Sequence, residues 1–391
     1  MFGHPYCLLC KNVYNMKKIV AIIFCMLLIT SCNRQTANRD NATCRIDLKK
    51  VDTPSFYDYF SRIEIIPLET SDESLIRDIG ERLYHNGKYY IFDRPQKKIL
   101  VFDRKGKFLY NIDKRGNGPG EYSDLSSFGF NSFTGDLELL SPMGGILRYD
   151  SLGQNFKEKI PLPLTVPAAQ QFIALNKKTY LLFCAFREGN KMVVYDIEQH
   201  KIISELYDLP KFIFSDTFYH HTYSPFYICE GKVHFVQSYN GDVFTFENNS
   251  LVSEYCWDFG EQNFNISGLK KQPSDDYYMK YDRTIGAKYA NSFVSYGENL
   301  RYYIANCSYD NKTWTLIYDK RSKKATVFNG FKEGHGCVPS FVDESGIYYI
   351  GAYPNYGLNV LNANELDADN RKIFNSIRDD DNPVVIKYVF K

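Results

Sequence analysis

The stretch from Leu83 to Tyr122 constrains the fold of this chain more than any other segment. It reads LYHNGKYYIFDRPQKKILVFDRKGKFLYNIDKRGNGPGEY, and three short runs within it alternate polar and apolar residues. Turn-forming residues separate the runs, at Asn86-Gly87, Asp93-Arg94-Pro95 and Arg104-Lys105-Gly106. Alternation with a period of two between tight turns is typical of antiparallel strands joined as a meander. The stretch therefore predicts one small antiparallel sheet.

The same unit recurs along the chain. An aromatic residue followed by an acidic one ends the third run of each unit, at Phe102-Asp103, Tyr149-Asp150, Tyr195-Asp196, Phe246-Glu247 and Tyr318-Asp319. A further turn at Glu344-Ser345-Gly346 begins a sixth unit. Four-stranded sheets repeated roughly every 40 to 50 residues are typical of β-propeller blades. We therefore expect an all-β, six-bladed β-propeller with four-stranded antiparallel blades; a seventh stays open only if the longer interval before Tyr318 hides a unit.

The two ends of the chain predict how the ring closes. The last run, PVVIKYVFK, reads as the third strand of the sixth unit, and no fourth strand follows it. The run Ile63 to Leu68 precedes the first unit and can supply that outermost strand. A ring closed by an N-terminal strand leaves no open sheet edge.

The N-terminal segment indicates export. From Met16 the chain reads MKKIVAIIFCMLLITSC, a basic start followed by an apolar run that is short for a membrane span. Ile29-Thr30-Ser31-Cys32 resembles the bacterial lipobox, so we expect lipidation at Cys32 and a true start at Met16. We divide the chain into upstream residues plus signal (1–31), a polar flexible tether (32–45) and a single propeller domain (46–391).

Charge and cysteine content limit the partners. Lys and Arg total 47 and Asp and Glu total 46, a formal net charge of +1, so no overall field attracts nucleic acid. Membrane contact is expected through the lipid anchor only. The cysteines after Cys32 match no zinc-binding spacing, and we expect most of them to be small buried residues in strands.

Several motifs together resemble a known family. They are Ile65-x-Pro67-Leu68-Glu69, Phe102-Asp103-x-x-Gly106, Gly116-x-Gly118-Pro119-Gly120-Glu121-Tyr122 and Asn382-Pro383-Val384. This set resembles the six-bladed β-propeller lipoproteins of Gram-negative anaerobes, which are relatives of NHL-type propellers. The resemblance covers nearly all of the mature chain and implies the fold and an envelope location. It implies no common activity.

Connection lengths distinguish the two faces of the predicted ring. In a meander blade, the turns within the first and the last strand pair lie on one face, and all of these turns are tight. The other connections lie on the opposite face and include all the long ones: 113–122, 208–225, 261–292, 331–337 and 353–381. Long loops on a rigid scaffold often carry function. We therefore expect the ligand at the loop-rich face and its central mouth.

The candidate binding residues all lie on that face. They are Arg94, Arg115, Glu121, Tyr122, His220, His221, Tyr239, His335 and Tyr356. Aromatic rings and amides would suit a glycan or a peptide. Each also has a structural interpretation: GNGPGEY as an inter-blade turn in which Glu121 binds nearby backbone, the histidines as packing or exposed groups, and the tyrosines as residues at blade edges.

Two functions follow. The first is a non-catalytic, lipid-anchored envelope protein, facing the periplasm rather than the cell surface, that binds a glycan, a peptide or an envelope protein. The chain lacks a nucleophile elbow, an H-E-x-x-H motif and a phosphate loop, and we predict no cofactor. The alternative is a lactonase-like hydrolase or lyase whose metal, such as Ca²⁺, would bind Glu121, Asn291, His221 and His335 at the central mouth.

Overall fold

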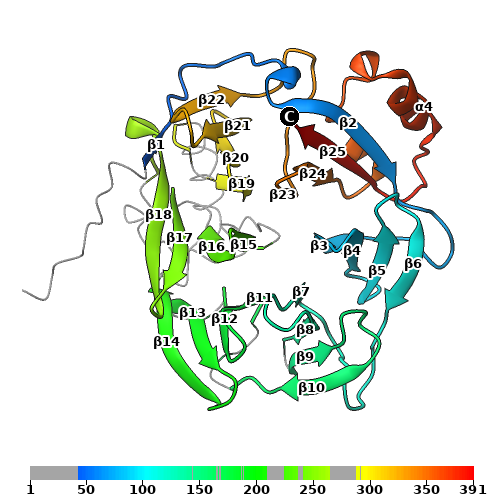
Figure 1. Ribbon diagram of the computed structural model, residues 1–391, viewed down its shortest axis with the longest axis vertical. Helices are drawn as coiled ribbons and strands as arrows, with labels where there is room; N and C mark the ends of the chain where they lie inside the picture. The colour runs from blue at the N-terminus through cyan, green and yellow to red at the C-terminus, as the bar shows by residue number, and fades with distance from the viewer. Residues whose placement is uncertain are drawn as a thin grey trace, which may run out of the picture. The chain divides into compact units, whose positions relative to one another are not determined.

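The strands form a ring of blades around a central axis in the computed structural model (Figure 1). The structure describes residues 43–391 except 143, 164–165, 167–168, 186, 188, 209–223, 237–240, 265–287 and 291. Within these residues there are six antiparallel sheets of four strands, one of them extended by a short parallel fifth strand. The predicted all-β six-bladed propeller is confirmed.

The blades follow one another in chain order, each from its innermost to its outermost strand. Blades 1 to 3 contain β3 (Ile79–His85), β4 (Lys88–Asp93), β5 (Lys98–Asp103) and β6 (Phe108–Ile112); β7 (Ser127–Phe130), β8 (Leu137–Ser141), β9 (Gly145–Tyr149) and β10 (Phe156–Ile160); and β11 (Gln171–Ala174), β12 (Thr179–Phe183), β13 (Asn190–Asp196) and β14 (Lys201–Asp208).

Blades 4 and 5 contain β15 (Phe226–Cys229), β16 (Lys232–Val236), β17 (Asp242–Glu247) and β18 (Ser250–Asp258); and β19 (Ser292–Glu298), β20 (Tyr302–Tyr309), β21 (Lys312–Asp319) and β22 (Lys324–Phe328). Blade 6 contains β23 (Phe341–Asp343), β24 (Gly346–Ile350), β25 (Val384–Phe390) and β2 (Phe60–Pro67). Short helices are η3 (Phe56–Asp58), η5 (Gly260–Gln262), α3 (Pro354–Leu358), η7 (Ala363–Glu365) and α4 (Ala368–Ser376).

Packing between blades explains why 16% of the residues of this chain are aromatic. The middle strands bury nearly every residue, as β8 and β12 do throughout, because each blade is covered on both faces by its neighbours. Large rings fill the space between blades; Tyr90, Tyr122 and Tyr149 belong to one core cluster of blades 1 and 2. The outermost strand β14 is only half-buried or exposed along its length, as expected at the rim.

Strand β2 closes the ring as predicted. It pairs antiparallel with β25, with Ile63 opposite Tyr388 and Ile65 opposite Ile386. The free edge of β2 is covered in part by the side chain of Asn370 on α4. That amide accepts a hydrogen bond from the Ile65 N–H at 3.1 Å and donates one to the Ile63 carbonyl at 2.9 Å. The closing strand is therefore held on both sides.

The start of the domain differs from the prediction. Residues 43–45, which we assigned to the tether, form β1 (Thr43–Arg45), which pairs parallel with β18, and Cys44 is buried. The chain then follows the outer edge of blade 5, where the Asp52 N–H donates to the Val327 carbonyl at 2.7 Å. A three-residue strand is too short to give a period-two signal, so its pairing could not be seen in the sequence.

The strand bounds also confirm the difference between the two faces. The connections β3–β4, β5–β6, β7–β8, β9–β10, β15–β16 and β21–β22 are tight turns on one face. The long connections, including the one from β24 to β25 that contains α3, η7 and α4, lie on the other. One predicted turn is displaced: blade 5 turns at residues 299–301, directly after Gly297-Glu298.

Candidate functional site

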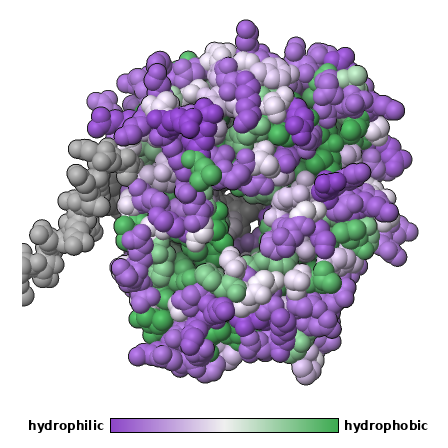
Figure 2. All heavy atoms as spheres, viewed as in Figure 1, coloured by the Kyte–Doolittle hydropathy of each residue, from purple (hydrophilic) through white to green (hydrophobic). Residues whose placement is uncertain are grey.

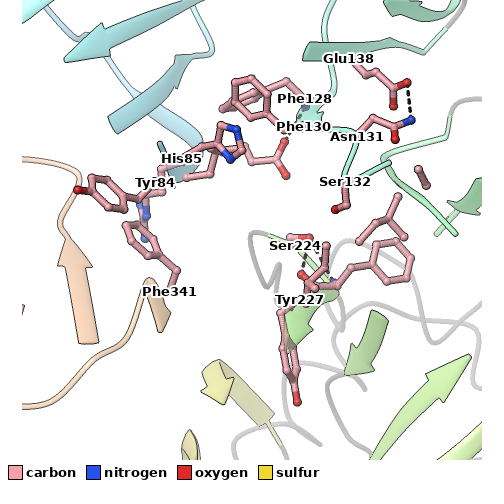
Figure 3. A pocket seen from close by; sticks show the side chains of 18 of the residues that line it. Tyr84, His85, Phe128, Phe130, Asn131, Ser132, Glu138, Ser224, Tyr227 and Phe341 are labelled. Atoms are coloured by element: carbon pink, nitrogen blue, oxygen red, sulfur yellow. Dashed lines mark hydrogen bonds between the residues drawn. The ribbon is translucent and has the colours of Figure 1, made fainter. Parts of the chain in front are cut away.

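A cavity of about 920 Å³ occupies the centre of the ring. Residues from all six innermost strands line it, as do several of the tight turns. Figure 2 shows the hollow in the ring, bordered by both apolar and polar residues. In Figure 3, Tyr84 and Phe341 lie on one side of this central channel, and Asn131 and Ser132 lie on the other. A cavity of this size accommodates a small ligand or a short segment of a chain.

The channel wall between blades 1 and 2 combines stacked rings with a carboxyl group. His85 on β3 stacks on Phe130 on β7, with ring centroids 3.9 Å apart and planes inclined by 13°. Glu81, four residues before His85, accepts hydrogen bonds from the Ser127 hydroxyl at 2.8 Å and the Phe128 N–H at 2.9 Å. Burial raises the pKa of Glu81 to about 7, although both hydrogen bonds favour its charged form.

Blades 4 and 5 form another part of the wall around Glu298. The Tyr227 hydroxyl donates to one oxygen of this carboxylate at 2.7 Å, and the Lys320 ammonium donates to the other at 2.5 Å. His234 stacks on Tyr227, with centroids 4.7 Å apart, and its Nε2 lies 2.6 Å from the Glu254 carboxylate. Burial raises the pKa of Tyr227 well above its usual value, so its hydroxyl stays a donor. Glu298 is thus neutralised by its own neighbours.

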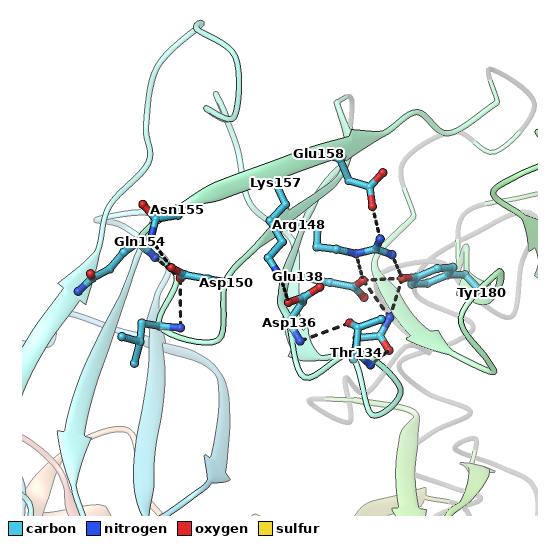
Figure 4. Close-up of polar contacts among 12 residues, drawn as sticks. Thr134, Asp136, Glu138, Arg148, Asp150, Gln154, Asn155, Lys157, Glu158 and Tyr180 are labelled. Carbon is cyan, nitrogen blue, oxygen red and sulfur yellow. Dashed lines mark hydrogen bonds and ion pairs between the residues drawn. The ribbon is translucent and has the colours of Figure 1, made fainter.

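Blade 2 carries a buried polar network beside the channel (Figure 4). Glu138 lies within hydrogen-bond reach of Arg148 Nε at 2.9 Å, Asn131 Nδ2 at 3.0 Å and the Tyr180 hydroxyl. Arg148 also contacts Glu158 and bonds the Tyr180 hydroxyl at 2.7 Å. Burial raises the pKa of Glu138, and the bonds from Tyr180, Asn131 and Arg148 oppose that shift. The network is satisfied internally and shapes the wall.

The six described residues among the predicted binding residues do not line the cavity. By strand order, the connections that contain Arg94, Arg115, Glu121, Tyr122, His335 and Tyr356 lie on the loop-rich face. Arg115, Glu121 and Tyr122 share the connection between β6 and β7, where a backbone bridge pairs Arg115 with Tyr122, and the other three lie in separate connections. The predicted residues His220, His221 and Tyr239, together with Asn291 and the lipidation residue Cys32, lie outside the described residues.

The exposed members of this set show no shared site. Arg94 lies 3.7 Å from Asp78, and Arg115 pairs with Asp113 at 2.5 Å within its own loop. Tyr356 is 63% exposed.

Tyr122 and His335 are core residues. Tyr122 is 2% exposed, and its hydroxyl donates to the Lys97 carbonyl at 2.6 Å. His335 is equally buried, packs edge-on against Phe56, and accepts a hydrogen bond from the Asn362 N–H on Nδ1 at 3.0 Å. Burial lowers the pKa of His335. Both side chains are therefore used inside the fold.

The Gly116 to Tyr122 segment is an inter-blade turn of the kind we inferred as its structural interpretation. The Gly118 N–H donates to Glu121 at 2.8 Å. A Cβ on Gly116 would lie 2.0 Å from the same carboxylate, so any other residue there would displace the Glu121 side chain. Among the described residues, no group of three or more His, Cys, Asp or Glu side chains is arranged to hold a metal ion.

Sequence reasoning missed the channel residues Glu81, His85, Phe130 and Tyr227. Each stands on the first strand of its unit, and that position could have identified it as facing the axis. The long loops led us to expect the ligand at the loop-rich face instead. The tight turns on the other face gave no sign that the innermost strands border a cavity.

Comparisons with known proteins support the fold. An experimental structure of a "Putative exported protein" from Bacteroides fragilis is 16% identical, with a TM-score of 0.66, over 90% of this chain and 99% of that one. A member of the DUF4221 family from Bacteroides vulgatus is 11% identical, with a TM-score of 0.50, over 85% and 97% of the two chains. No functionally curated protein is significantly similar to this chain. The model of the family described as "Domain of unknown function (DUF4934)" matches residues 43–389, and the chain therefore belongs to the DUF4934 family.

Proposed function

We propose that this protein is a non-catalytic binding protein of the cell envelope and that its ligand occupies the central channel. The observation that carries the proposal is the cavity of about 920 Å³ lined by all six innermost strands. Aromatic side chains from blades 1, 2, 4 and 6 border it, among them His85, Phe130, Tyr227 and Phe341. Rings supply stacking surfaces and the polar groups between them fix orientation, which is how carbohydrate and peptide sites are built.

The envelope location is supported by the N-terminal segment. The basic start, the short apolar run and the lipobox-like tetrapeptide end at Cys32. A structurally similar protein from Bacteroides fragilis carries the description of an exported protein, which is consistent with this assignment. The described residues contain no helix long and apolar enough to span a membrane. We propose that a lipid on Cys32 anchors the domain facing the periplasm, as in the NHL-like lipoproteins that the sequence resembles.

The ligand classes that suit the channel are a glycan or an extended peptide segment. Either can enter a narrow axial cavity end-on, whereas a folded partner protein could reach it only through a protruding segment.

The test is a binding screen of residues 43–391 against glycan and peptide arrays, followed by calorimetry on each hit. His85→Ala and Phe341→Ala remove rings from two neighbouring blades of the channel wall, 1 and 6 (Figure 3), and Tyr356→Ala is the matched control on the loop-rich face. We expect loss of binding in the two channel variants and wild-type binding in the control, with unchanged circular dichroism in all three. Binding that survives both channel variants but is lost in Tyr356→Ala would overturn the channel and favour the loop-rich face.

A further inference from the structure

We infer that the channel selects ligands that carry an organic cation, an ammonium or guanidinium group attached to an apolar body. This inference rests on the proposed function, because it assigns the chemistry of the ligand in that same channel. It follows from the charges and the rings that border the cavity.

Carboxylates outnumber cations among the described residues that line the channel. The acidic residues are Glu81, Asp136, Glu138, Asp150, Glu298 and Asp343, and the basic ones are Arg82 and Lys157. Three of the carboxylates are neutralised locally by ion pairs, Asp136 by Lys157, Glu138 by Arg148 and Glu298 by Lys320.

The remaining carboxylates Glu81, Asp150 and Asp343 have no ion pair within the described part of the chain. Asp150 and Asp343 accept hydrogen bonds from turn N–H groups, of Gln154 at 2.8 Å and Ser345 at 2.7 Å. Such bonds stabilise the carboxylates but leave their charge in place. An anionic ligand would be repelled by these carboxylates, and a cationic ligand would be attracted to them.

Aromatic rings beside these carboxylates add a second attraction for a cationic ligand. Glu81 on β3 bonds the backbone of Phe128 on β7, and the stacked pair of His85 and Phe130 follows on the same two strands. Figure 3 shows this pair at the channel wall. A cation on an apolar stem is attracted both by a carboxylate and by the face of an aromatic ring, and this combination favours ammonium and guanidinium groups. A neutral sugar would use the rings but not the charge.

The experiment uses two matched probe pairs on residues 43–391, measured by calorimetry. The first is tetralysine against the same peptide acetylated on every side-chain amine, and the second is the chitosan tetramer against its N-acetylated form. Each pair differs in positive charge, and the two pairs separate a peptide from a glycan source. We expect the cationic member of at least one pair to bind at least about tenfold more tightly than its acetylated form.

Variants then locate the effect. At pH 7.5, above the pKa of Glu81, Glu81→Gln should weaken the cationic probe about threefold to tenfold and leave the acetylated probe unchanged. Glu365→Gln, an exposed carboxyl outside the channel, should change neither. Equal or tighter binding of both acetylated probes, no binding of either cationic probe, or a cationic preference that Glu81→Gln leaves intact would each overturn the inference.

If acetylated probes bind and His85→Ala abolishes that binding, the channel function stands and only the cation selectivity fails. Loss of all binding in Tyr356→Ala but not in His85→Ala would instead reject the channel itself.

Discussion

The side-chain oxygen of Asn382 accepts a hydrogen bond from the backbone N–H of Ile76, 306 residues earlier in the chain, at 2.8 Å. The amide nitrogen of the same side chain donates to the carbonyls of Glu69 and Ser74 at 2.7 and 2.8 Å. Asn382 is 1% exposed. One buried amide thus satisfies three backbone groups of the segment that joins the closing strand β2 to blade 1.

Asn382→Ala is expected to destabilise the domain by about 2 to 4 kcal/mol, because it leaves buried backbone groups without partners. Asn382→Asp should also destabilise it, since a carboxylate cannot donate to the two carbonyls. Urea unfolding followed by fluorescence measures both effects. The control is Asn364→Ala at an exposed position; equal stability of Asn382→Ala and this control would show that the amide is dispensable.

Removal of the closing strand should destabilise the entire ring. A chain that begins at residue 71 lacks β2 and exposes the edge of β25, so we expect its melting temperature to fall far more than trimming a loose arm would cause. A chain that begins at residue 55 keeps β2 and loses only β1 and the segment 46–54, which runs along the outer edge of blade 5. Its melting temperature should lie between that of the full domain and that of the chain that begins at residue 71. A melting curve of the shorter chain that matches the full domain would contradict ring closure as a source of stability.

The fold was predictable because its signals are local. Each blade contains its own alternation and turns, and the unpaired run Val384 to Phe390 implied a partner strand at the other end of the chain. The parallel pairing of Cys44 beside Trp257 was not predictable, since three residues carry no periodic signal.

The channel could not be predicted in the same way, because its contacts join different blades. The stack of His85 on Phe130 depends on how two blades pack against each other, and no spacing within either unit encodes it. Residue type alone was also a poor guide at Tyr122 and His335, whose polar groups bind backbone inside the core.

The buried pair in blade 2 should tolerate joint replacement better than single replacement. Arg148→Met removes the cation that pairs with Glu138 at 2.9 Å, leaves a buried carboxylate uncompensated, and should cost about 3 to 5 kcal/mol. Adding Glu138→Gln removes that charge and keeps an acceptor for Asn131 and Tyr180, so the double variant should recover part of the loss. Chemical denaturation of the two single variants and the double variant completes the cycle; strictly additive effects would mean that the pair is not coupled.

Lipid anchoring makes a prediction about fractionation. The full chain should sediment with membranes after a carbonate wash, and Cys32→Ala should move to the soluble fraction because no acyl chain can be attached. Cys25→Ala, within the apolar run, serves as a matched control and should remain in the membrane. Retention of Cys32→Ala in the washed membrane would contradict the anchor.

Glu81 should make stability fall as the pH rises. Burial raises its pKa in the folded chain from 4.5 to about 7, so the folded chain binds this proton more tightly than the unfolded chain does. The contribution is therefore fully present below about pH 4.5 and is lost as the pH rises through about 7. Glu81→Gln keeps an acceptor for the Ser127 hydroxyl and the Phe128 N–H but cannot ionise, so it escapes this loss.

The difference in unfolding free energy between Glu81→Gln and wild type should grow in favour of Glu81→Gln by about 1 to 2 kcal/mol as the pH rises from 4.5 to 8. This is less than the full shift implies at about 1.4 kcal/mol per pKa unit, because the side chain is partly open to the channel. Urea unfolding at four pH values in this interval measures the difference, and other carboxyl groups cancel because both proteins contain them. The unfolding free energy of Glu365→Gln should change with pH in the same way as that of wild type. If the unfolding free energy of Glu81→Gln also followed wild type at every pH, the Glu81 carboxyl would be ionised in the folded protein at no cost in stability.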